Sequence, residues 1–182
     1  ELRLCGLARS KGLVLSENGV DASEARNGMA GSTAPDPLRV ADFVASRKPI
    51  CPVFVDCTSD ASLASRYGEL LAAGLHVVTA NKKANAGSYA YWQELREKAR
   101  AGQRRFLYET NVGAGLPVIS TLQSLLACGD RVRRFEGILS GSLSFLLGRL
   151  EEGIAFSVAV REAMDKGFTE PDPRDDLGGQ DV

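Results

Sequence analysis

Strand-like apolar runs alternate with segments of helical spacing, and this alternation constrains the fold more than any other feature of the chain. Both kinds of segment repeat along the first two thirds of the 182 residues. Alternation of this type predicts an α/β domain with a parallel sheet. The strand-like runs are residues 2–8, 51–59, 75–83 and 105–109, and the helical segments between them are residues 36–47, 60–73 and 88–101.

The ends of the expected helices carry local signals. Asp36 is placed as an N-cap and Pro37 as a first helical residue, and Gly74 suits the left-handed position after a helix. Glu94 and Lys98 are one turn apart on the segment 88–101, which favours an ion pair on a surface helix. The strand-like run at 2–8 is apolar on both faces, as strands are when helices cover both sides of a sheet. We therefore expect a partial Rossmann-like, doubly wound parallel sheet.

The pattern changes after Gly129. A helix at 116–127 with an apolar stripe of Val118, Leu122 and Leu125 is the last segment of the first type. A strand at 133–140 and helices at 142–152 and 157–166 follow. We place a domain boundary near residue 130, with an incomplete α/β domain over 1–130 and the start of a second, α+β domain over 131–182.

Charge and composition exclude several classes of partner. The chain has 22 basic and 23 acidic residues and a net charge of −1, which offers no footprint for nucleic acid. No run reaches the roughly 18 apolar residues of a membrane span, so we expect a soluble, cytoplasmic protein. Its cysteines are too widely spaced for a disulfide framework or a metal knuckle, and we expect buried thiols at Cys5, Cys51, Cys57 and Cys128.

Small polar and basic residues follow the expected strands, where ligands bind in open parallel sheets. Thr58 and Ser59 follow the second strand and Lys82 the third. Arg9 follows the first strand, where an arginine favours the phosphate of NADP. A GxGxxG turn is absent after the first strand, and we expect it upstream if the chain begins at the second strand of a longer domain. His76 lies within a strand and is expected to be structural.

The last thirteen residues, 170–182, hold five acidic side chains and one basic one. An EF-hand calcium loop fails here, because counting from Asp172 puts Arg174 at position three and Leu177 at position six. A solvated acidic loop is the plainer alternative. Two prolines and two glycines in this stretch suggest instead a backbone held in one path.

Five motifs together resemble the homoserine dehydrogenase family, and most closely the dehydrogenase part of its bifunctional aspartokinase members. They span about residues 55–182, and the last one is specific. The motifs are CTS at 57–59, HVVTANKKAN at 76–85, LYETNVGAGLPVI at 107–119, EGILSGSLSFLL at 136–147 and GFTEPDPRDDLGGQDV at 167–182.

The resemblance implies an oxidoreductase that interconverts aspartate 4-semialdehyde and homoserine with NADP or NAD, in threonine and methionine biosynthesis. It implies a nucleotide-binding domain followed by a domain that binds substrate and dimerises, so a homo-oligomer is expected. It also explains the acidic tail, because the cationic α-amino group of the substrate requires anionic acceptors.

Site residues carry over from the family motifs. Lys82 matches the lysine that faces the nicotinamide and the substrate, and Asp181 the carboxylate beside the reacting carbon. The family's general acid is a lysine four residues after Asp181, beyond Val182, so we expect the 182 residues alone not to turn over. The remaining matches are Thr58, Ser59 and Arg9 for the cofactor and Gly141, Ser142, Glu170 and Asp176 for the substrate.

Glu109 matches a monovalent cation site for sodium or potassium, together with the backbone carbonyls of Val112, Ala114 and Leu116. One carboxylate and neutral carbonyls suit a hard ion of low charge. Phe168 departs from the family, which is expected to carry tyrosine there.

Plainer interpretations exist for most of these residues. Lys82 and Lys83 are also typical of surface lysines past a strand, Glu109 of a salt bridge, and Thr58, Ser59 and Ser142 of helix caps. At the level of the whole chain, the alternative is a catalytically silent nucleotide-binding or regulatory module. The absent glycine fingerprint and the absent lysine support that alternative.

Overall fold

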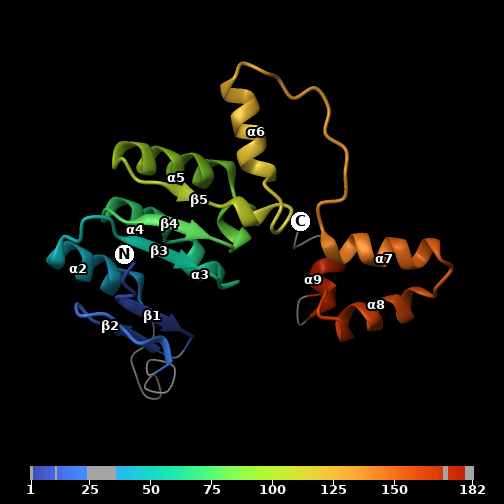
Figure 1. Ribbon diagram of the computed structural model, residues 1–182, viewed down its shortest axis with the longest axis horizontal. Helices are drawn as coiled ribbons and strands as arrows, with labels where there is room; N and C mark the ends of the chain where they lie inside the picture. The colour runs from blue at the N-terminus through green and yellow to red at the C-terminus, as the bar shows by residue number, and fades with distance from the viewer. Residues whose placement is uncertain (1, 11, 24–35, 170–171, 179–182) are drawn as a thin grey trace. The chain divides into compact units, whose positions relative to one another are not determined.

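A computed structural model of the protein describes residues 2–10, 12–23, 36–169 and 172–178. The contacts between residues divide the chain into two compact parts, Glu1–Tyr108 and Glu109–Val182, which we call unit 1 and unit 2 (Figure 1). Each is described by itself. The functional domain boundary that we expect near residue 130 stays a prediction.

Unit 1 contains the parallel sheet that the alternating pattern predicts. Its strands lie in the order β3 (Val53–Asp56), β4 (His76–Thr79) and β5 (Phe106–Leu107), and both neighbouring pairs are parallel. All three fall inside the expected runs and are shorter than those runs. The mixed α/β class is confirmed.

Helices of unit 1 begin and end largely where the sequence signals predict. The Asp36 carboxylate accepts a hydrogen bond from the Leu38 amide at 2.9 Å, and Pro37 is the first residue of the helix. Gly74 has the expected positive φ, +93°, and Lys98 pairs with Glu94 at 2.7 Å. The segment after Asp60 forms two helices instead of one. The helices are α2 (Pro37–Arg47), α3 (Ala61–Ala64), α4 (Tyr67–Ala72) and α5 (Tyr89–Ala101).

The core of unit 1 forms around α4, whose residues Tyr67, Leu70 and Leu71 are fully buried. Their helical spacing puts them on the face that meets the sheet and α5, where Val77 and Leu95 are also fully buried. The buried cluster consists of Ala64, Tyr67, Leu70, Leu71, Leu75, Val77, Ala84, Leu95 and Ala99.

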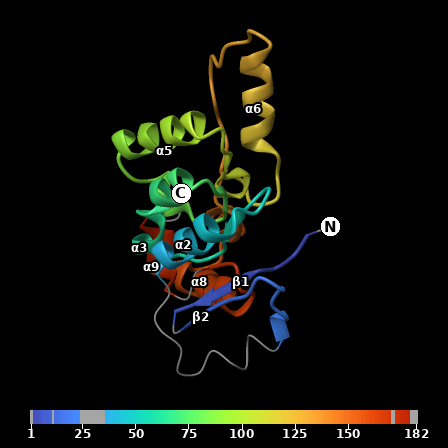
Figure 2. The same ribbon diagram turned by 90° about the vertical axis from the view of Figure 1, so that its left-hand side faces the viewer.

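The expectation for the first strand is wrong. Instead of one strand over 2–8 in the parallel sheet, β1 (Gly6–Arg9) pairs antiparallel with β2 (Gly12–Leu15) in a separate two-stranded sheet (Figure 2). The second run follows the first after two residues, a spacing that favours a hairpin. Leu2 is fully exposed. The short connection therefore overrides the apolar pattern.

Cover on both faces of the sheet is also not found within the described residues. Val53 and Val55 of β3 are 47% and 62% exposed, whereas Asp56 is buried. Contacts of α4 with α2, α5 and β4 place these elements around the same core. The described part of unit 1 thus buries one face of β3 and leaves the alternate side chains of that strand exposed.

Unit 2 is helical in its described part. Helices α7 (Gly141–Glu151) and α8 (Phe156–Asp165) lie side by side (Figure 1) and bury Leu146, Ala159 and Ala163 between them. Arg149 donates to both carboxylate oxygens of Glu162 at 2.9 and 3.0 Å, which ties the two helices together. The other elements are η2 (Glu109–Asn111), α6 (Val118–Ala127) and α9 (Pro173–Leu177).

One expectation for unit 2 is wrong. Residues 133–140, all described, form no strand, because the described part of this unit holds no other strand to pair with them. The stripe on α6 is not buried: Leu122 and Leu125 are 39% and 49% exposed, since no described element covers it.

All four cysteines also differ from the expectation of buried thiols. Cys51, Cys57 and Cys128 are exposed and Cys5 is half-buried. They lie at the ends of strands and of α6, outside the packed faces. All four are free thiols, as their spacing predicts. No helix in the described ranges is both long and apolar enough to cross a membrane.

Candidate functional site

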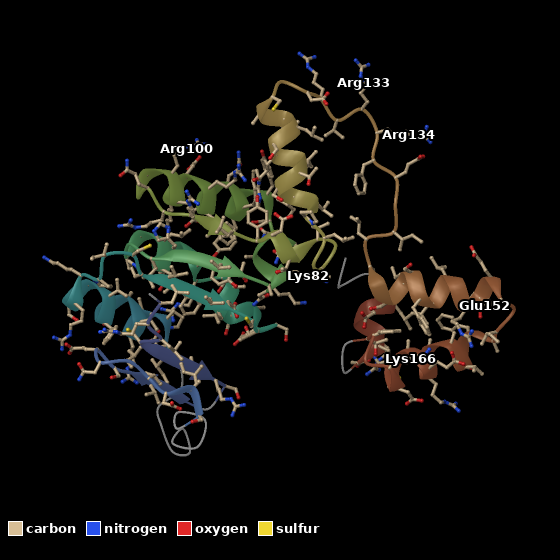
Figure 3. All side chains as sticks on the ribbon, in the orientation of Figure 1. Lys82, Arg100, Arg133, Arg134, Glu152 and Lys166 are labelled. Carbon is tan, nitrogen blue, oxygen red and sulfur yellow. The ribbon has the colours of Figure 1, made fainter. Side chains whose placement is uncertain are left out.

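The carboxyl ends of β3 and β4 bring two of the expected site segments together. The last residues of these strands, Asp56 and Thr79, are direct partners in the parallel register. The chain continues from them into the segment with Thr58 and into the short turn η1 (Lys82–Ala84). Figure 3 shows Lys82 beyond the end of β4. This edge is where an open parallel sheet binds its ligands.

A buried polar network lies beneath this edge and is centred on Asp56, which is 1% exposed. One carboxylate oxygen accepts from the Thr58 amide at 2.7 Å. The other accepts from the side-chain amide of Asn81 at 3.1 Å and from the Tyr67 hydroxyl. Burial and the neighbouring Asp56 hold the pKa of Tyr67 well above its ordinary value of 10.0, so the phenol stays a hydrogen-bond donor.

Thr79 and Asn81 complete the network. The Thr79 hydroxyl lies 2.8 Å from the Tyr67 hydroxyl and accepts from the Asn81 amide at 2.9 Å. The Asn81 side chain donates to the carbonyl of Asp60 at 2.9 Å and accepts from the Lys83 amide at 3.1 Å. Every one of these contacts is of ordinary hydrogen-bond length.

The expected cofactor residues above the network are accessible. Thr58 and Ser59 are exposed and Lys82 is half-buried. The cap interpretation is wrong for Thr58 and Ser59, because Asp60 caps α3 by accepting from the Ser62 amide at 2.7 Å. Hydroxyl groups and an ammonium group thus remain at the ligand-binding edge of the sheet.

Arg9 is not brought to this edge by strand pairing. It is the last residue of β1, in the separate hairpin, and it is exposed. Its proposed contact with a nucleotide phosphate assumed a first strand in the parallel sheet, and that assumption is wrong. The role itself stays a prediction.

In unit 2 the structure joins two expected substrate residues. The Ser142 hydroxyl donates to Asp176 at 2.8 Å and also lies against the carbonyl of Phe168. Ser142 and Asp176 are both buried, and Asp176 is only 1% exposed. Gly141 begins α7 and is exposed. The cap of that helix is Ser140, which accepts from the Leu143 amide at 3.2 Å, so the cap interpretation is wrong for Ser142.

Two further expected residues, Glu170 and Asp181, lie outside the described residues. The structure therefore positions part of the expected substrate side, through Ser142 and Asp176, and does not describe the rest.

Glu109 binds the start of α6. Its carboxylate accepts from the Ile119 and Ser120 amides at 2.9 Å each, which satisfies free amides of the first helical turn. The segment before the helix is tightly turned, with Gly113 and Ala114 both at positive φ. Within the described ranges no three His, Cys, Asp or Glu side chains gather as a metal cluster.

Sequence reasoning missed the network itself. Asp56 stood inside an apolar run and Tyr67 inside the apolar stripe of a helix, so both were taken only as part of their elements. A carboxylate within the apolar run VFVDC was the available signal. His76 has the expected structural contact, since its ring nitrogen accepts from the Arg105 amide at 2.9 Å.

Comparison with known families and structures agrees with this geometry. Residues 1–109 match the family described as homoserine dehydrogenase, NAD binding domain, and residues 117–182 match the one described as homoserine dehydrogenase. An archaeal homoserine dehydrogenase solved in complex with NADPH superimposes with a TM-score of 0.78 at 27% identity, covering 100% of this chain and 57% of that one.

Curated relatives show the same. The bifunctional aspartokinase/homoserine dehydrogenase of Haemophilus influenzae is 54% identical over 183 residues, and that of Buchnera aphidicola 47%. Each alignment covers 100% of this chain and 22% of the relative. The fold and these matches define an NAD-binding domain of the α/β class, followed by a segment that matches the second family model. The chain belongs to the homoserine dehydrogenase family.

Proposed function

We propose that the natural protein carrying these residues is a homoserine dehydrogenase, which interconverts aspartate 4-semialdehyde and homoserine with NADP or NAD. The observation that carries the proposal is the shared edge of β3 and β4. It supports the proposal because the segments that carry Thr58 and Lys82 continue from paired ends of the two strands and are joined by one buried network.

The residues at this edge have separate roles in the proposal. The nucleotide, when bound, supplies or accepts the hydride. Thr58 and Ser59 offer small hydroxyl groups that let it approach the backbone, and Arg9 is the candidate for its phosphate. The Lys82 ammonium faces the substrate oxygen, where negative charge develops during reduction, and a charged donor stabilises that charge.

On the substrate side we propose Gly141, Ser142, Glu170 and Asp176. The hydrogen bond between Ser142 and Asp176 supports their assignment to one site. Glu170 would accept from the cationic α-amino group of the substrate, and Asp181 would lie beside the reacting carbon and orient the general acid.

We further propose a sodium or potassium ion held by Glu109 and the carbonyls of Val112, Ala114 and Leu116, a homo-oligomeric state and a cytoplasmic location. The donor set supports the ion, since Glu109 Oε2 accepts from a single α6 amide and keeps a second lone pair. Activity that does not change when both ions are replaced by a bulky organic cation would contradict it. Sedimentation and cell fractionation check the other two.

The main test uses two adjacent lysines. In the natural full-length protein, Lys82→Ala is expected to lower kcat for NADP-linked oxidation of homoserine by about 10²–10³-fold, the usual loss for one charged donor at a reacting oxygen. Lys83→Ala, on the same turn and exposed, is the matched control and is expected to stay within about twofold of the parent. Equal effects of the two variants, or no homoserine-dependent reduction by the parent, would contradict the proposal.

A further inference from the structure

We propose that Asp56, Tyr67, Thr79 and Asn81 are positioning residues, which hold the loop after β3 and the turn after β4 in one fixed relation for the reaction. This inference rests on the proposed function, because it assigns the network to the cofactor edge. It concerns how Thr58 and Lys82 are kept in place, not a new contact with the ligand.

The two oxygens of Asp56 reach two different segments. One accepts from the amide of Thr58, in the loop after β3. The other accepts from the side chain of Asn81, in the turn after β4. A single carboxylate that is 1% exposed thus bridges the two segments that carry the expected cofactor residues.

Asn81 makes a second bridge between the same segments. Its side-chain amide also donates to the carbonyl of Asp60, and its side-chain oxygen caps η1 by accepting from Lys83. Lys82 is the first residue of that turn. The direction in which the lysine leaves the backbone therefore depends on where Asn81 is held.

Tyr67 and Thr79 connect the network to the apolar core of unit 1. The Tyr67 hydroxyl contacts both Asp56 and Thr79, and the Tyr67 ring is fully buried in the core beneath the sheet edge. Thr79 in turn accepts from the Asn81 backbone amide. The network thus contacts the buried apolar cluster of unit 1 through Tyr67 and the two loops through Asp56 and Asn81.

A role in stability alone explains this arrangement less well. Buried polar pairs add little net stability compared with apolar side chains of the same shape, whereas satisfied networks give rigidity and a single geometry. Rigid support by a surrounding layer of residues is what a reacting constellation needs, since a displacement of about 1 Å costs on the order of 10²-fold in rate.

The test uses Thr79, because its hydroxyl can be removed or kept with little change of volume. In the natural full-length protein, Thr79→Val removes the acceptor for the Asn81 amide, and Thr79→Ser keeps it. We express kcat for homoserine oxidation per NADPH-binding site. We expect Thr79→Val to lower this kcat by about 10- to 100-fold. Thr79→Ser is expected to recover most of that loss.

The control is Tyr91→Phe, which removes a hydroxyl that donates to the Ala64 carbonyl at 2.8 Å in the same core and outside the network. It is expected to leave kcat per site within about twofold of the parent. Counting NADPH sites by titration at saturation separates misplacement from unfolding, because unfolded molecules lower the number of sites and not the rate at each. Tyr67→Phe, which keeps the packed ring, replaces Thr79→Val if that variant does not fold.

The outcomes separate the two proposals. If the parent is active and Thr79→Val or Tyr67→Phe has the same kcat per site as Tyr91→Phe, the positioning role is overturned. The proposed function is then unaffected. A parent without homoserine-dependent turnover overturns the proposed function, and the positioning role with it. Loss in Thr79→Val with recovery in Thr79→Ser supports both.

Discussion

Two buried aspartates, one in each unit, use the same chemistry in different surroundings. Asp56 in unit 1 and Asp176 in unit 2 are each 1% exposed and each accepts from a hydroxyl group. Among the described residues, a cluster of nine buried apolar residues lies around Asp56, whereas the cluster of unit 2 has three. This difference in the size of the apolar cluster indicates what each carboxylate contributes to its unit.

In unit 1 the apolar core is large enough to hold the fold, so the network is available to fix loop geometry. In unit 2 the described helices α7, α8 and α9 bury little apolar surface, and small cores give little net stability. The contact between Ser142 and Asp176 joins α7 to α9 there. We infer that the polar contact contributes a larger share of local stability in unit 2 than in unit 1.

The largest expected effect comes from the same truncation made in each core. Leu70→Ala in unit 1 is expected to destabilise its surroundings by about 2–5 kcal/mol, since Leu70 is fully buried within the large cluster. Leu146→Ala in unit 2, at 2% exposure, is expected to cost less, because a small core collapses more readily onto the cavity. Hydrogen exchange read separately at α4 and α7 measures both.

Equal losses of protection against hydrogen exchange at α4 and α7 would contradict the expected difference between the two units. They would mean that α7 is packed in solution as tightly as α4.

A smaller effect is expected from Ser142→Ala, which removes the donor to Asp176. Leaving a buried carboxylate short of a donor costs about 1–3 kcal/mol. Hydrogen exchange at α7 and α9 is expected to speed up accordingly. Ser144→Ala is the control, since Ser144 is exposed on the same helix. If the two variants exchange alike, the Ser142 contact contributes nothing to unit 2.

The elements that the sequence predicts well are those with local causes. The cap at Asp36, the glycine at 74 and the ion pair between Glu94 and Lys98 each depend on residues close together in the chain, and each prediction is confirmed. The parallel sheet is confirmed for a similar reason. Its strands are separated by helices, which leaves parallel pairing as the natural connection.

The failures have long-range causes. A strand at 133–140 requires a partner that periodicity cannot supply, and the strand at 2–8 gave way to a hairpin with the next run. For the site, the motifs brought out Thr58, Lys82, Ser142 and Asp176, whereas Asp56 and Tyr67 escaped notice. A buried polar group shows its function only once its partners, here 11 positions apart in the chain, are known.

The smallest effect concerns a half-buried carboxylate of unit 2, Asp172, and bears on the contrast with fully buried Asp176. Asp172 caps α9 by accepting from the Arg174 amide at 3.0 Å and pairs with the Arg174 side chain at 2.9 Å. The side chain and then the backbone amide of Arg174 lower the Asp172 pKa to about 2.

This pKa is lower in the folded chain than its ordinary value of 3.8. The ionised carboxylate therefore stabilises the capped helix fully at pH values above 3.8. That contribution is lost as the pH falls through about 2. Carbon-13 NMR titration of the carboxyl group is the measurement. In Arg174→Gln the pKa is expected to rise and still stay below the ordinary value, because the backbone amide remains. A pKa that does not move in this variant would assign the whole shift to the cap, and one that reaches the ordinary value would show that α9 has no cap at Asp172.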